Sequence, residues 1–399
     1  MSTTRRTFLA GLAGSLGAAV GVPGLRPLAA PPRCELLETL PFLDERNVPL
    51  GKTVGSGLGR RLAFDLSTLS PESLVTSTEK FFIRTGCPDR MRSTERWKIS
   101  VHGLVAQPVE LLLQELAREA EPMGVHLLEC AGNSGEGKYG LMSAARWTGL
   151  PIGRVLERVT RLRQATRLLI SGFDEHSEAH PDSTPGASWI FTFEQLDRSR
   201  AFLATEMNEA PLRPDHGFPV RLVMPGWYGC ACIKWVNEIV FLDDTAAATE
   251  HMREFAGRTD QDAAGPLDFL MAKPPGAPRD FGPRLAKDYK PANIPIAALP
   301  VRAEKWRVEG KTRYRVVGIL WGGDRLTRAL VIRLGHAGEY VPVEDCEHRT
   351  NATWTLWSHT FQARAPGKHS IDLRVNDPAV SAPRLDSGFY RRSVEIESI

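Results

Sequence analysis

The chain has 399 residues, of which 42% are hydrophobic, and carries 50 Lys and Arg against 47 Asp and Glu. Three of these arginines and no acid fall in residues 1–30, so the remainder has 47 basic side chains (50 minus 3) and 47 acidic ones. A balance this even excludes nucleic-acid binding, which needs a clustered basic excess. Residues 31–399 contain no run near the ~20 apolar residues of a transmembrane helix, and their number predicts two domains.

Residues 1–30 have the pattern of a twin-arginine signal peptide. Arg5 and Arg6 precede a Thr-Phe-Leu string and an uncharged stretch rich in Ala, Gly, Leu and Val, and Leu28-Ala29-Ala30 offers a cleavage site. We expect removal of this segment and a soluble, periplasmic mature protein; the alternative is a basic tail before a buried helix. Because the twin-arginine route carries folded proteins, the signal also indicates a cofactor that is inserted before export.

Strand-like and helical runs alternate from residue 81 to residue 244, which predicts a mixed α/β domain over residues 45–245 in a chain of the α+β class. The expected strands, recognised by short apolar runs, are residues 97–103, 167–170, 219–224 and 233–242. The expected helices are residues 111–118, which carry leucines at helical spacing, and residues 150–159.

The pattern changes after residue 245. Residues 246–300 include a Lys-Pro-Pro-Gly-Ala-Pro string and are predicted to be a linker. From residue 301 to residue 399 short alternating runs predict an all-β, immunoglobulin-like sandwich. Its expected strands are residues 314–320, 328–334, 354–364 and 370–375.

One cysteine stands out among six. An apolar run at residues 125–128, broken only by His126, leads to Cys130, and a Gly/Ser-rich loop follows. This layout predicts a strand that presents Cys130 to a cavity, as a metal ligand, a nucleophile or half of a disulfide. Because the chain has neither a CxxC pair nor a CxxCH motif, zinc and covalent haem are not expected. We expect Cys130 to be a free thiolate, and a disulfide involving Cys34 or Cys346 stays open.

Basic side chains interrupt several apolar strings. Arg84 lies in an apolar string, His216 and Arg221 begin another, and Lys234 enters a third. A buried arginine is costly unless an anion meets it. Each residue alone also fits an ordinary role, namely an edge salt bridge, a turn histidine or a surface lysine. Together with Cys130 they favour a metal held by sulfur on a large ligand that carries phosphate.

These strings together resemble the sulfite oxidase family of molybdopterin-dependent oxidoreductases. They occur in the family's order from residue 75 to residue 244, and more weakly through residues 318–323. The strings are Phe81-Phe82-Ile83-Arg84-Thr85, Cys130-Ala131-Gly132-Asn133, Arg146-Trp147-Thr148-Gly149-Leu150-Pro151, Glu206-Met207-Asn208 and residues 215–234.

The resemblance implies the site residues and the cofactor. Cys130 would be the protein's sulfur ligand to molybdenum, and Arg84 a catalytic cation that faces the substrate. The positions that match residues binding molybdopterin and its phosphate are Phe81, Phe82, Ile83, Arg84, Thr85, Asn133, Asp174, His216, Arg221, Cys232, Ile233 and Lys234. The sandwich would be the family's dimerisation domain, so a homodimer is expected.

Two departures bear on the substrate. Ser134 and Gly135 stand where sulfite oxidases carry arginines, and the string from Glu129 is closer to the molybdenum subunit of bacterial sulfane dehydrogenase. Residues 253–260 lack the tyrosine that the family often carries in this region, and Arg258 is either a cation of the site or a surface arginine. The roles of Glu136 and Lys138 are not assigned.

The resemblance therefore predicts an exported molybdenum enzyme that transfers oxygen at sulfur. We expect oxidation of sulfite or a related reduced sulfur compound, with electrons passed to a separate carrier such as a c-type cytochrome. One alternative is reduction of methionine sulfoxide with the same cofactor. A non-enzymatic β-sandwich binding protein is a third, against which the combination of Cys130 with buried cations argues.

Overall fold

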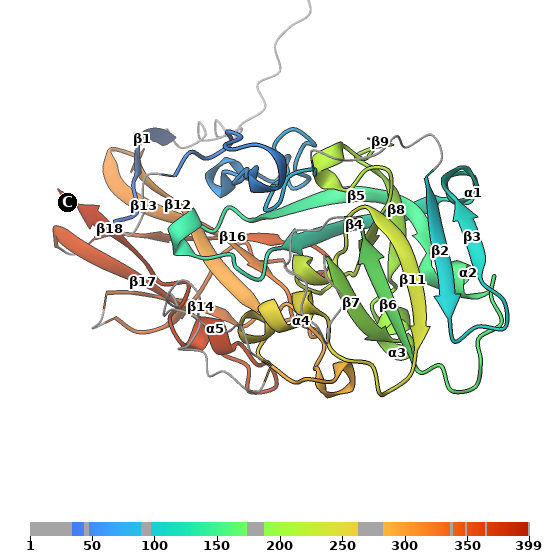
Figure 1. Cartoon of the computed structure of the whole chain (residues 1–399). Coiled ribbons are helices and arrows are strands. Elements are labelled where there is room, and N and C mark those ends of the chain that lie inside the picture. Colours follow the sequence, from blue (N-terminus) through green and yellow to red (C-terminus); the bar gives the residue numbers. More distant parts are fainter. Residues whose placement is uncertain are drawn as a thin grey trace, which may run out of the picture.

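The computed structural model describes residues 34–43, 48–88, 97–173, 187–261, 282–335, 338–347, 349–363 and 365–397. The predicted signal peptide, residues 1–30, therefore lies outside the described residues. The described strands form four sheets, two at each end of the molecule (Figure 1). None of the helices in the described ranges is long and apolar enough to cross a membrane.

Two five-stranded sheets form the first domain. One has the order β10-β8-β5-β4, with β9 paired to β8, and the other has the order β3-β2-β11-β6-β7. The strands of the first sheet are β4 (Glu121–Glu129), β5 (Met142–Pro151), β8 (Phe202–Met207), β9 (Ala210–Pro211) and β10 (Arg221–Val223). Those of the second are β2 (Lys98–Gly103), β3 (Val109–Leu112), β6 (Arg167–Gly172), β7 (Ser188–Thr192) and β11 (Val236–Leu242).

The helices are short, and α1, α2 and α3 each follow directly on a strand. The α-helices are α1 (Leu113–Arg118), α2 (Ile152–Leu156), α3 (Phe193–Arg198), α4 (Glu250–Glu254) and α5 (Pro383–Asp386). The 3₁₀ helices are η1 (Gly57–Gly59), η2 (Leu66–Thr68), η3 (Gly135–Gly137), η4 (Pro214–His216), η5 (Gly229–Ala231), η6 (Ala256–Arg258) and η7 (Ala286–Asp288).

The predicted strands are present, but both predicted helices begin too early. Leu111 and Leu112 belong to β3 and pair with Ile99 and Lys98 of β2, so the helix starts only at Leu113. Residues 150–151 likewise end β5, which leaves α2 five residues long and ending at Leu156. Sheet pairing to distant strands overrides the leucine spacing, since strand formation depends on cross-strand neighbours more than on local preference.

Two four-stranded sheets form the predicted β-sandwich. Their orders are β1-β12-β13-β16 and β15-β14-β17-β18. The strands are β1 (Cys34–Leu40), β12 (Ala297–Val308), β13 (Lys311–Trp321), β14 (Leu330–Leu334), β15 (Val341–Pro342), β16 (Thr355–Phe361), β17 (Gly367–Val375) and β18 (Arg392–Ile396). The prediction of a mixed domain followed by a β-sandwich is confirmed.

Strand β1 joins the sandwich although it precedes the first domain in the sequence. It pairs antiparallel with β12, from Cys34 opposite Val308 to Leu40 opposite Ala303. In Figure 1 this blue strand lies among the orange and red strands. The sandwich is thus completed by a strand from the other end of the chain, which the sequence pattern did not predict.

The segment predicted as a linker is folded where the structure describes it. Thr249 caps α4, its hydroxyl accepting a hydrogen bond from the Met252 N–H at 3.1 Å. The helix packs against β7, and β12 begins at Ala297, before the expected start of the sandwich. The Lys-Pro-Pro string itself lies outside the described residues.

Candidate active site

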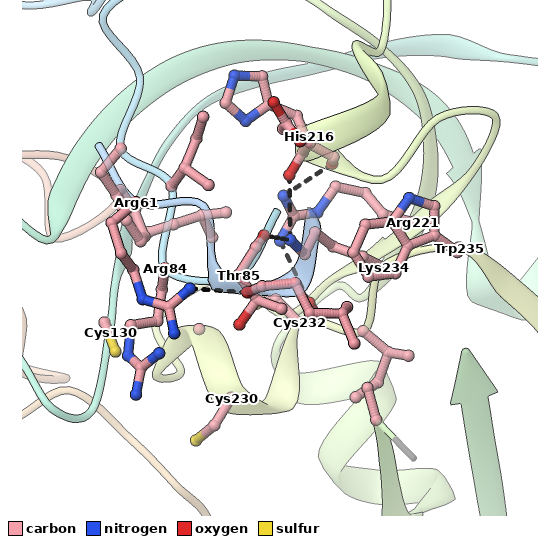
Figure 2. Close-up of a pocket in the computed structure, with 18 of the residues that line it drawn as sticks. Arg61, Arg84, Thr85, Cys130, His216, Arg221, Cys230, Cys232, Lys234 and Trp235 are labelled. Carbon is pink, nitrogen blue, oxygen red and sulfur yellow. Dashed lines mark hydrogen bonds between the residues drawn. The ribbon is translucent and has the colours of Figure 1, made fainter. Parts of the chain in front are cut away.

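A cavity of about 440 Å³ opens in the first domain. Its wall combines the end of β4, the loops before β2 and β11, η4, η5 and the segment that follows β11. Figure 2 shows Cys130 on one side of this cavity, with Arg61 and Arg84 beside it, and shows His216, Arg221 and Lys234 grouped on the other side. A sulfur and a group of cations therefore face the same cavity from opposite sides.

Cys130 follows directly on the last residue of β4, as predicted. Its side chain is buried, its N–H donates to Leu141 O at 2.9 Å, and its sulfur accepts from the Gly132 N–H at 3.4 Å. Burial raises the pKa of the Cys130 thiol, and Arg84, the Gly132 N–H and Arg258 act in the opposite direction. A thiol kept protonated is a poor nucleophile, whereas a bound metal ion removes the proton itself. All six cysteines lie in the described residues and none forms a disulfide, so the disulfide that the sequence left open is not formed, and metal ligation stays the prediction for Cys130.

Three guanidinium groups surround the sulfur. Arg84 and Arg258 both act on the Cys130 thiol. Arg258 also borders the loop that follows Cys130, because a Cβ built on Gly132 would lie 3.4 Å from Arg258 Nη1 and 3.8 Å from the sulfur. Arg61, which the sequence analysis did not single out, lines the same cavity. Burial lowers the pKa of Arg61, and the positive charge of Arg84 lowers it further.

Arg221 is the most deeply buried cation of the site. Nη1 donates to His216 O at 3.0 Å and Nη2 to Cys232 O at 3.2 Å, while Nε has no hydrogen-bond partner among the described residues. Burial lowers the pKa of Arg221 to about 10, so the side chain is charged at neutral pH. A buried guanidinium with a spare donor is the kind of group that an anionic ligand completes.

Lys234 and Asp215 hold the loop that carries Arg84. Lys234 Nζ donates to Thr85 O and, at 3.0 Å, to Asp215 O. The Asp215 carboxylate accepts from Arg60 Nη1 at 2.9 Å and from the Cys87 N–H at 2.8 Å. At Gly86 the backbone lies so close to Gly57 that a Cβ built on Gly86 would be 2.3 Å from Gly57 O. Segments that are far apart in the sequence are thus tied together around the cavity.

His216 is buried and should remain neutral at pH 7. Its Nε2 donates to Thr78 O at 3.2 Å, and its ring packs edge-on against Phe81 at 5.3 Å. Burial lowers the pKa of His216 to about 4, although the Thr78 carbonyl acts in the opposite direction. A neutral, oriented imidazole at this place donates and accepts hydrogen bonds without adding charge.

This pKa predicts a pH dependence of stability in the cofactor-free chain. Below pH 6.5 the unfolded state protonates His216 while the folded state does not, so the free energy of unfolding falls as the pH drops toward 4. The loss reaches about 3 kcal/mol, since each pKa unit is worth about 1.4 kcal/mol. Urea unfolding between pH 7 and pH 4 measures it, with His216→Gln as the comparison. Equal pH slopes for the two proteins would contradict the assignment.

The structure gathers most of the predicted site residues. Asn133 does not line the cavity; it braces the loop after Cys130, donating from Nδ2 to Glu129 Oε1 at 3.3 Å and accepting from the Leu141 N–H at 3.0 Å. Asp174 lies outside the described residues. The predicted residues in the cavity wall are Phe81, Phe82, Ile83, Arg84, Thr85, Cys130, His216, Arg221, Cys232, Ile233 and Lys234.

The cavity wall also contains residues that were not predicted. These are Arg61, Asp215, His251 and Phe255, among others. Asp215 could have been predicted, because it is the first residue of the string that carries His216 and Arg221. No local pattern marks Arg61, whose neighbours in the sequence form no regular element, or His251, which lies in the segment predicted as a linker.

Comparison with known proteins agrees with this geometry. Residues 85–250 match the family model of the oxidoreductase molybdopterin binding domain. A nitrate reductase [NADPH] of Aspergillus niger is 30% identical over 196 residues, which cover 45% of this chain and 22% of that protein. The mitochondrial sulfite oxidase of Rattus norvegicus is 28% identical over 220 residues, 51% of this chain and 40% of that protein. The chain thus matches well under half the length of these relatives.

A solved structure extends the likeness to both domains. The sulfane dehydrogenase SoxCD from Paracoccus pantotrophus superposes with a TM-score of 0.63 at 17% identity, covering 87% of this chain and 88% of that chain. At this identity the match concerns the fold, and it includes the mixed domain and the β-sandwich.

The matched region and the cavity define the class of the domain: residues 85–250 form an oxidoreductase molybdopterin binding domain, and Cys130, His216, Arg221 and Lys234 of the cavity wall lie within it. The order of its motifs and its 28% identity to sulfite oxidase support the resemblance to the sulfite oxidase family, and the sulfane dehydrogenase structure shares its fold.

The residues present fit the cofactor. The buried Nε of Arg221 lacks a partner among the described residues, as expected for a donor that meets a phosphate group, and Lys234 lies beside it. Cys130 supplies a buried sulfur on the opposite side of the cavity. The residues that would hold the cofactor are therefore Cys130 at the metal and His216, Arg221 and Lys234 at the phosphate, with the backbone of residues 81–85 between them.

Proposed function

We propose that this enzyme transfers oxygen to an anionic reduced sulfur compound, with sulfite as the first candidate. The observation that carries the proposal is the set of three guanidinium groups, Arg61, Arg84 and Arg258, around the Cys130 sulfur. Guanidinium groups present paired donors that match the oxygens of an oxyanion. Repulsion among the three cations is relieved when an anion enters, so a negatively charged substrate is favoured over a neutral one.

The cofactor, when bound, supplies two-electron redox chemistry at molybdenum. The protein's residues supply binding and orientation. The arginines would hold the oxyanion beside Cys130. Water supplies the oxygen that the reaction adds to sulfur, and the two electrons pass to the carrier. The Gly132 N–H on the Cys130 sulfur, at 3.4 Å, withdraws electron density from that ligand and so tunes the metal.

Export, assembly and electron transfer are part of the same proposal. Residues 1–30 support a periplasmic enzyme exported by the twin-arginine route. The described residues form no haem-binding domain of their own, so a separate one-electron carrier such as a c-type cytochrome would accept the electrons. The sandwich would mediate a homodimer, as the family resemblance implies.

Two other activities use the same cofactor. Methionine sulfoxide is neutral, so three cations give it no advantage. Nitrate is an oxyanion and several relatives are nitrate reductases, so nitrate reduction is the second candidate. It runs in the opposite redox direction, which makes the two candidates separable by assay.

The decisive assay compares the two directions on one preparation of molybdenum-loaded enzyme. We expect sulfite to drive reduction of ferricyanide or cytochrome c, and a reduced dye to give little turnover with nitrate or methionine sulfoxide. The Cys130→Ser protein serves as the blank in every arm. Activity only with the reduced dye and nitrate would overturn the proposed direction, and activity only with methionine sulfoxide would overturn the anionic substrate as well.

A further inference from the structure

The residue immediately before the metal ligand carries a buried carboxylate. Glu129 ends β4 and is 1% exposed. Both of its oxygens accept hydrogen bonds: Oε1 from Asn133 Nδ2 at 3.3 Å and Oε2 from Trp321 Nε1 at 2.8 Å. A carboxylate this deeply buried is retained only where its partners are well placed.

The shorter of these bonds crosses between the two domains. Trp321 is the last residue of β13 in the sandwich, 192 positions from Glu129 in the sequence. It is fully buried, pairs with Ala297 of β12, and packs edge-on against Tyr390 with ring centroids 5.4 Å apart. The position of its indole N–H, the only donor of the side chain, is therefore set by the sandwich and not by the domain that holds Cys130.

The position of Glu129 is passed on to Cys130 by short contacts. Asn133, which donates to Glu129, accepts from the Leu141 N–H at 3.0 Å, and Leu141 O accepts from the Cys130 N–H at 2.9 Å. On another side, a Cβ built on Gly229 would lie 3.2 Å from Glu129 O and 3.9 Å from Cys130 Cα. Because the backbone is packed this closely around Glu129 and Cys130, a shift of Glu129 moves Cys130 as well.

The sandwich makes two further contacts with the walls around Cys130. Arg384 of α5 donates from Nη2 to Arg258 O at 2.9 Å, and its charge acts on Glu129. Tyr139 donates from its hydroxyl to Phe389 O at 2.6 Å. The same domain thus holds the residue before Cys130, the segment of Arg258 and the loop that follows Cys130.

We propose that Trp321 is a positioning residue for Cys130: through its hydrogen bond to Glu129, the sandwich determines where the metal's protein ligand stands. Groups that orient a metal ligand from outside the coordination shell typically change metal affinity by about 10–100-fold when removed. The proposal rests on Cys130 as the ligand and not on the substrate, so a negative result with sulfite leaves it intact.

The test removes the donor and keeps the ring, in Trp321→Phe of the full chain. The matched control is Trp354→Phe, because Trp354 makes an equivalent bond from the sandwich, Nε1 to Leu74 O at 2.9 Å, to a segment that does not carry Cys130. Three properties are measured. The loaded enzyme gives the Mo(V) electron paramagnetic resonance spectrum and the rate of cofactor loss. The cofactor-free chain gives the rate of Cys130 alkylation, followed by mass spectrometry.

We expect Trp321→Phe to shift the Mo(V) spectrum, to lose cofactor about tenfold faster than the parent and to expose Cys130 to alkylation. Trp354→Phe should match the parent in all three. Glu129→Leu, which removes the acceptor of the same hydrogen bond without altering the sandwich, should reproduce the Trp321→Phe spectrum even if the latter folds poorly. Equal spectra and alkylation rates in Trp321→Phe and Trp354→Phe, or a parent-like Glu129→Leu, would reduce Trp321 to an ordinary interface residue and overturn the proposal.

Discussion

Cys130→Ser should reduce turnover to less than about 1% of the parent enzyme, a larger loss than the 10–100-fold typical of residues outside the coordination shell. Cys130 is the buried sulfur of the cavity that the family places on the metal, and serine offers a hard, weakly acidic oxygen where a soft thiolate is needed. Steady-state turnover is measured together with molybdenum content per chain, so that loss of the metal and loss of reactivity are distinguished.

Cys230→Ser is the matched control, because Cys230 is buried and lines the same cavity. The family resemblance assigns the metal to Cys130 and not to Cys230, so Cys230 should make no metal bond. We expect Cys230→Ser to keep its molybdenum and most of its activity. Substantial turnover in Cys130→Ser, or a greater loss in Cys230→Ser, would mean that the wrong thiol has been assigned to the metal.

Arg84→Met should lower kcat/KM for sulfite by about 10²- to 10³-fold. Removing one partner of a buried charge pair costs about 2–5 kcal/mol, and each 1.4 kcal/mol is about tenfold. Arg84 acts directly on the Cys130 thiol and lines the cavity, so its charge is lost at the place where the oxyanion would bind. Arg84→Lys keeps the charge but not the paired donors, so its kcat/KM for sulfite should lie between those of the parent and Arg84→Met.

The control for Arg84 is Arg198→Met on the outer face of α3. The Arg198 side chain is 80% exposed and its salt bridge to Glu194 is on the surface, so the change should leave sulfite kinetics within about twofold, as exposed ion pairs contribute little. If the kcat/KM of Arg84→Met for sulfite equalled that of the parent, the cationic pocket would not select the substrate. A neutral substrate such as methionine sulfoxide would then return as the leading candidate.

Much of the fold could be predicted because its signals are local. The alternation of Ile371, Leu373 and Val375 with polar neighbours marks β17, since a strand with one buried face repeats every two residues. The starts of α1 and α2 could not be predicted in this way. There, Leu111 and Leu150 begin runs predicted as helices but pair with other strands, and only the register of the sheet decides between helix and strand.

The candidate site shows the same difference between residues that carry a local sequence signal and residues that only the fold brings together. Arg84, Arg221 and Lys234 could be singled out because each brings a group that is costly to bury into an apolar string, and Cys130 because it ends an apolar run before a Gly/Ser-rich loop. Arg61 gives no such signal, since its segment has no periodicity. The sequence likewise left Arg258 open between a surface residue and a member of the site, and its place beside Gly132 is visible only once the chain is folded.

By itself, the sequence predicted the cofactor and the division into a mixed domain and a sandwich, because motif order and residue spacing are properties of the chain; it also proposed Cys130 as the sulfur ligand. Only the tertiary structure decided that β1 completes the C-terminal sheet, that three arginines meet around Cys130, and that Trp321 reaches Glu129 across the domain boundary. These contacts join residues up to hundreds of positions apart. Such contacts depend on packing and register, which no local pattern records.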